Sequence, residues 1–147
     1  MLLRAIPQSI HRAFPDIPIY TERVVQGMQY PCFSVLVVSA SQRELIGNRY
    51  PASWLLMVRF FPSDDGSESS YAALHEIAQT LYGVMDEVRY QTEAEEDDVY
   101  FGIHMAHYIE ENVLHFQTTY NFWLKKVLPE VPLMQELDIN VKAGEQG

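Results

Sequence analysis

Two histidines three residues apart, His104 and His107, are the first candidates for chemistry, because imidazole nitrogens are common ligands of Zn²⁺. Glu110 and Glu111 follow closely. The surrounding stretch predicts a β-strand, on which residues three apart point to opposite faces, so the two rings cannot share an ion without a bulge. His115 could face one of them across a hairpin. Two imidazoles are fewer than the ligands a zinc site needs, so we predict polar side chains on a sheet face and no metal.

A run of carboxylates is the second candidate, because clustered carboxylates can bind Ca²⁺. The run consists of Glu93, Glu95, Glu96, Asp97 and Asp98. It lacks the glycine and the alternating oxygen ligands of an EF-hand loop, and no Glu follows at the twelfth position. We therefore interpret residues 92–98 as a solvated acidic loop.

The remaining motifs give no catalytic centre. Cys32 is the one cysteine, so an intramolecular disulfide and a four-cysteine zinc site are both excluded, and its place before an apolar strand is typical of a buried small side chain. Gly47 and Asn48 stand without a glycine-rich phosphate cradle, and no Gly-x-Ser-x-Gly motif occurs. The sequence predicts a protein that is not an enzyme and has no cofactor.

Length and charge narrow the class of protein further. The chain has 147 residues and a formal net charge of −10 at pH 7. This length predicts a single domain over residues 1–147, with a flexible end at residues 142–147. The acidity argues against binding to nucleic acid or to an anionic membrane, both of which need clustered basic residues. A lone cysteine is compatible with a reducing, intracellular compartment.

The hydrophobic pattern predicts the first elements. Apolar residues at spacings of three and four indicate a helix within residues 1–14, which Pro15 and Pro18 end. Strands are expected at residues 19–25, 33–38 and 54–61. The polar residues 39–52 are interpreted as a long loop. This loop exceeds the length usual in a hairpin and is therefore a candidate for function.

The second half of the chain predicts another helix and further strands. Asp65 and Glu68 have the spacing of a capping box, and the helix that they begin runs to about Val88. Strands follow at residues 100–109, 113–126 and 137–141. The strand at 113–126 alternates apolar and polar side chains, and its length predicts that it projects beyond the domain. This order predicts an α+β fold, a mainly antiparallel sheet packed on one side by two helices.

Basic side chains gather at two places outside the N-terminus. Arg43 and Arg49 form one pair, and Lys125 and Lys126 form the other. On an acidic chain we interpret them as anchors for an acidic protein surface rather than as contacts to nucleic acid. Ordinary surface charge is the alternative for each residue singly.

A set of segments along the whole chain carries a resemblance to a known family. The segments are Leu45-Ile46-Gly47-Asn48-Arg49-Tyr50, Val58-Arg59-Phe60-Phe61-Pro62, Ile109-Glu110-Glu111-Asn112-Val113-Leu114-His115-Phe116, Tyr120-Asn121-Phe122, Met134 and Leu137-Asp138-Ile139. With them the chain resembles small tail-terminator (tail-completion) proteins, which phages and prophages of Gram-positive bacteria encode. None of these segments is catalytic, so the resemblance rests on accumulated pattern.

The resemblance implies a structural role in virion assembly. Tail terminators form a ring, typically a hexamer, that binds the last ring of tail-tube protein, stops its polymerisation and presents a surface to the head connector protein. DNA passes through the ring without specific binding. The implied fold is a β-sheet flanked by helices. The implied location is the bacterial host cytoplasm during assembly and then the neck end of the virion tail.

The resemblance also suggests which residues make contacts. Residues 39–52 and the strand at 113–126 would reach a neighbouring subunit or the tube, whereas the apolar neighbours of Trp54 favour a place in the core. The predicted interface residues are Arg43, Arg49, Tyr50, Trp123, Lys125 and Lys126. The acidic residues 93–98 are expected to face the DNA channel, because negative charge there repels phosphates.

Two other classes of function stay open on the sequence. One is a small-ligand or metal-binding domain that uses a sheet face with His104, His115 and Asn121, and the other is an adaptor that binds a cellular partner. Neighbouring genes for a tail sheath, tail tube or tape-measure protein would favour the terminator. An unrelated metabolic operon would count against it.

Overall fold

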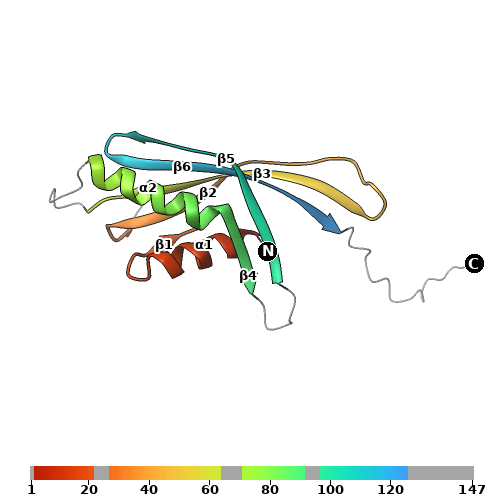
Figure 1. Ribbon diagram of the computed structural model, residues 1–147, viewed down its shortest axis with the longest axis horizontal. Coiled ribbons are helices and arrows are strands. Elements are labelled where there is room, and N and C mark those ends of the chain that lie inside the picture. The colour runs from red at the N-terminus through yellow and green to blue at the C-terminus, as the bar shows by residue number, and fades with distance from the viewer. Residues whose placement is uncertain (1, 22–26, 64–70, 92–96, 126–147) are drawn as a thin grey trace, which may run out of the picture.

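The computed structural model describes residues 2–21, 27–63, 71–91 and 97–125, and the structural statements below concern these residues. They form one curled, mixed sheet in the order β1-β2-β3-β6-β5-β4, with two helices against one face (Figure 1). The β1–β2 pair is parallel and the other pairs are antiparallel, so the fold is α+β. The elements are α1 (Leu2–Ala13), β1 (Ile19–Tyr20), β2 (Cys32–Gln42), β3 (Arg49–Phe61), α2 (Tyr71–Asp86), β4 (Glu87–Gln91), β5 (Asp97–Glu110) and β6 (Val113–Lys125).

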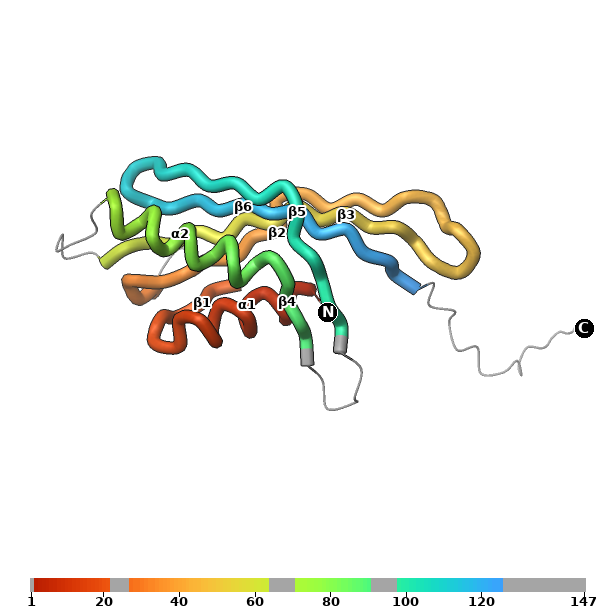
Figure 2. Tube along the Cα trace, in the orientation of Figure 1, coloured from red at the N-terminus to blue at the C-terminus, as the bar shows by residue number. Residues whose placement is uncertain are grey.

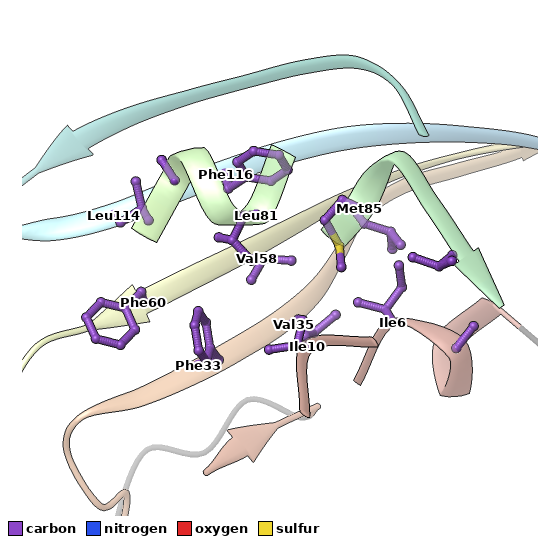
Figure 3. Close-up of a cluster of buried hydrophobic side chains, with 14 of the residues drawn as sticks. Ile6, Ile10, Phe33, Val35, Val58, Phe60, Leu81, Met85, Leu114 and Phe116 are labelled. Atoms are coloured by element: carbon purple, nitrogen blue, oxygen red, sulfur yellow. The ribbon is translucent and has the colours of Figure 1, made fainter. Parts of the chain in front are cut away.

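The hydrophobic core lies between the helices and the sheet face that they cover (Figure 3). The even-numbered β6 residues Leu114, Phe116 and Tyr120 are fully buried. Val58 of β3 lies opposite Phe116, so the even-numbered residues of β3 share this face. The predicted alternation along β6 is confirmed. The helices contribute Ile6, Ile10, Leu74, Leu81 and Met85 to the same core.

The prediction of a long loop at residues 39–52 is wrong. β2 continues to Gln42 and β3 begins at Arg49, so most of this stretch is paired strand. The side chains of residues 39–42 are exposed, and a segment without a buried face needs no apolar alternation to be a strand. Backbone pairing with β3 decides its conformation instead, and this pairing is not visible in the local sequence.

Other predicted ends of helices and strands also differ from those in the structure. α2 ends at Asp86, and Val88 belongs to β4, a strand that we did not predict, where it pairs with Tyr100. The two elements follow each other directly, so the buried Val88 continues the helical apolar pattern by coincidence of spacing. Asp97 and Asp98 begin β5 rather than end a loop. The predicted capping box, residues 22–25 of the first strand, the strand at 137–141 and the end at 142–147 lie outside the described residues.

β5 changes its partner strand at Gly102. Gly102 pairs with Tyr120 of β6, whereas Phe101 pairs with Glu87 of β4. A Cβ atom at Gly102 would stand 2.5 Å from the carbonyl oxygen of Met85, and the Tyr120 hydroxyl donates a hydrogen bond to that same oxygen at 2.8 Å. This close approach requires glycine. From Gly102 towards its N-terminus, β5 therefore diverges from β6, as Figure 2 shows.

Candidate interaction surface

Part of the sheet extends past the helices as an arm (Figure 1). We define the arm as residues 38–52, which are the far ends of β2 and β3 with their turn, together with residues 121–125 of β6. β3 is its central strand, since Ala52 pairs with both Gln42 and Phe122. β5 does not continue alongside, because its pairing with β6 ends at Tyr120. The strand predicted at 113–126 to project beyond the domain, β6, thus projects as one strand of a three-stranded arm.

A tight turn closes the tip of the arm. Ile46 donates its backbone N–H to Arg49 O at 2.8 Å, and Arg49 donates to Ile46 O at 3.2 Å. Gly47 occupies the first central position with φ +66°, a conformation that favours glycine and is typical of the two-residue turns of β-hairpins. Gly-Asn between two extended segments is a hairpin signal that the sequence contained and that the loop interpretation overlooked.

The structure brings five of the six predicted interface residues together on the arm. Arg49 pairs with Lys125, Tyr50 with Leu124, and Pro51 with Trp123, while the backbone N–H of Arg43 donates to Pro51 O at 2.8 Å. Lys126 lies outside the described residues. Three basic side chains and one acidic side chain, Glu44, therefore stand on the described arm of a chain whose net charge is −10. Whether these residues contact a partner stays a prediction.

The two tryptophans differ in burial, and Trp54 lies where its apolar neighbours predict. Trp54 packs against the core, and its ring meets Phe122 edge-on with centroids 5.8 Å apart. Trp123 leaves 54% of its surface exposed. It lines a groove of about 530 Å³ on the arm together with Ser41, Arg43, Pro51, Ala52, Ser53, Asn121 and Phe122. Exposed aromatic side chains beside a groove are typical of protein interaction surfaces.

Where β5 and β6 diverge, they leave a notch of about 360 Å³. Apolar side chains from three elements form most of its walls, and a carboxylate and an ammonium group stand among them. Consecutive residues of β6 line the notch, so it reaches the edge of that strand as well as one face. The lining residues are Leu2, Leu3, Trp54, Asp98, Tyr100, Phe122, Trp123, Leu124 and Lys125.

The acidic segment is described only in part. Glu93, Glu95 and Glu96 lie outside the described residues, whereas Asp97 and Asp98 are the first residues of β5. Burial, with the negative charge of Asp98 added to it, raises the pKa of Tyr100. Asp98, at the described end of the acidic segment, therefore lies at the notch. That the acidic segment faces a DNA channel stays a prediction.

The predicted histidine candidates do not meet. His104 has φ 53° beside a register shift between Ile103 and Ala106, which is the kind of bulge that a shared ion would have required. His107 instead contacts α2, with its Nε2 2.9 Å from His75 Nδ1 and its Nδ1 2.8 Å from the Tyr82 hydroxyl. No group of three or more potential metal-ligating side chains occurs within the described ranges. His75 and Tyr82 were missed because helix and strand are distant in sequence.

His115 lies on the open face of the sheet. Its ring stacks on Tyr108 with centroids 4.7 Å apart, and it pairs with Arg59 of β3. Burial and the charge of Arg59 lower its pKa, and burial together with His75 lowers the pKa of His107. Both imidazoles are therefore held towards the neutral form by their surroundings.

Comparisons with known proteins agree with a structural role. No curated protein matches the chain, and no helix in the described part of the chain is long and apolar enough to cross a membrane. A family model described as phage tail terminator protein matches residues 1–132, which is most of the chain. The family is structural rather than enzymatic and forms part of the phage tail. This protein belongs to the phage tail terminator family.

Proposed function

We propose that the protein caps the tail tube as a ring, typically a hexamer, stops polymerisation of the tube and forms the joint to the head connector. The arm is the observation that carries this proposal. It extends past the helices, and most of its side chains are exposed rather than packed in the core. Such an extension is explained if it contacts another protein.

The arm carries two different open strand edges. β1 pairs with β2 only at Phe33 and Ser34. From Val35 to Gln42, the edge of β2 that faces away from β3 therefore has no paired strand among the described residues. The opposite edge, along residues 121–125 of β6, likewise has no paired strand in the part of the chain that the structure describes. Unpaired edges invite further strands. Because the two edges differ, contact between copies would be head-to-tail, the type of interface that closes into rings.

Charge supports the same proposal. The arm presents Arg43, Arg49 and Lys125, whereas the chain as a whole is acidic. A basic arm suits an acidic surface on a neighbouring subunit or on the tube. The remaining acidic surface, including residues 93–98, would face the passing DNA and repel its phosphates.

The proposal is tested by growing tubes from the cognate tail-tube protein with and without this protein. Negative-stain microscopy measures tube length and detects a ring at the tube end. We expect shorter, capped tubes with the natural protein. Arg43→Glu with Lys125→Glu should lose capping, whereas Arg12→Glu, a charge reversal of an exposed residue on α1, should retain it. Tubes of unchanged length with bare ends would contradict the proposal.

A further inference from the structure

We infer that the tip of the arm of one copy inserts into the notch of the next copy. The tip is the segment Arg43–Arg49, and the notch is the space between the diverging strands β5 and β6. This inference rests on the proposed function, because it names the contact that joins neighbouring subunits of the ring.

The tip exposes apolar side chains at the point of the arm farthest from the core. Ile46 leaves 63% of its surface exposed, and the adjacent Leu45 is also exposed. The hydrogen bonds between Ile46 and Arg49 hold the turn in one shape. A large apolar side chain on a fixed, projecting turn has the properties of an interface anchor, which buries its surface in a pocket of the partner.

The notch has the matching apolar surface. Leu2 and Leu3 come from the first turn of α1, Trp54 from β3, and Phe122 and Leu124 from β6. The notch also reaches the open edge of β6, so the backbone of an entering segment can pair with residues 121–125 while its side chains contact these walls.

The tip and the notch each carry charges of both signs. Arg43 and Arg49 flank the apolar pair of the tip, with Glu44 between Arg43 and Leu45. Asp98 and Lys125 line the notch. Opposite charges on the tip and in the notch can therefore be placed next to each other across the contact.

A tip that enters the notch must come from a second copy. In the sheet order, β6 lies between the β2–β3 hairpin and the notch, and Arg49 at the tip pairs with Lys125 of the same chain. Within one chain, the tip lies on the β3 side of β6 and the notch opens on its β5 side, so a tip does not reach its own notch. Tip and notch are separate surfaces, so each copy can offer its tip to one neighbour and receive the tip of another.

Cysteine cross-linking tests the contact. A variant with Ile46→Cys is mixed with a variant with Leu3→Cys on growing tubes, oxidised gently and separated on a non-reducing gel. Cys32 can stay, because it is buried and burial raises the pKa of its thiol. We expect a disulfide-linked pair of chains, and a ladder of linked chains when both substitutions are in one chain. Tyr71→Cys, 68% exposed at the start of α2 and outside both the arm and the notch, replaces Ile46→Cys as the control and should give none.

A second measurement does not depend on disulfide formation. Ile46→Asp should raise the protein concentration needed to halve tube length by about tenfold or more, whereas Tyr71→Asp should change it little. Rings on tubes without the cross-link, or equal effects of both Asp variants, would overturn the tip-in-notch contact and leave the ring itself intact. Absence of any ring or cap would remove both proposals.

Discussion

Tyr120 ties the end of α2 to the point where β5 changes partner, and Tyr120→Phe measures this tie. The side chain is fully buried, and its hydroxyl donates to Met85 O at 2.8 Å. Met85 lies in the last turn of α2, where backbone carbonyls lack helical partners. The phenol is held in its neutral, donating form, because burial raises its pKa far above the ordinary value.

The substitution removes the donor and leaves the buried carbonyl oxygen of Met85 without it. A buried acceptor left unsatisfied costs about 1–3 kcal/mol. The ring stays in place, so no cavity is added to this loss. With a urea dependence of about 2 kcal/mol per M for a small domain, the unfolding midpoint should fall by about 0.5–1.5 M.

Urea unfolding followed by tryptophan fluorescence measures this midpoint. Tyr108→Phe is the matched control, because Tyr108 is 46% exposed on the open face of the sheet. It should change the free energy of unfolding by less than about 0.5 kcal/mol. Equal midpoints for the two variants, with unchanged urea dependence, would refute the assigned role of the Tyr120 hydroxyl.

Four further predictions concern stability. Gly102→Ala should lower the free energy of unfolding by about 1–3 kcal/mol, because its Cβ would meet Met85 O. Gly83→Ala, in open space on α2, should raise it by up to about 1 kcal/mol, so a loss at both sites in thermal unfolding would contradict this. Gly47→Ala should cost about 1 kcal/mol, measured by urea unfolding, and no loss would argue against the left-handed turn. Because the pKa values of His107 and His115 are lowered in the fold, the unfolded chain takes up protons first, and stability should fall as pH drops below about 6.5. Changing both to Gln should flatten that slope in urea titrations.

The sequence predicted elements whose own residues carry a pattern. β6 alternates between the core and the open face, and α1 places Ile6 and Ile10 on one side, so both were found. Ser39-Ala40-Ser41-Gln42 has no buried face, so its residue types predict a loop where the structure has the end of β2. β4 was absorbed into the preceding helix because Val88 is buried in either reading.

The candidate surface was predictable by residue type but not by arrangement. Exposed Trp123 and the basic side chains were identified, whereas their meeting on one arm depends on the pairing of Arg49 with Lys125, residues far apart in the chain. The notch depends on the change of partner at Gly102, which reflects the packing of Met85 and Tyr120 beneath it. Leu45 and Ile46 became candidates only once their exposure was known.

The paired strands and tight turn of the arm also affect how strongly it can bind. A flexible loop at residues 39–52 would lose its conformational freedom on association, at about 1–2 kcal/mol for each ordered residue. The hairpin has already lost most of that freedom during folding. An entropic cost on the order of 10 kcal/mol is therefore not incurred when the arm binds. A small, preorganised contact can then hold neighbouring copies together, and repetition around a ring multiplies it.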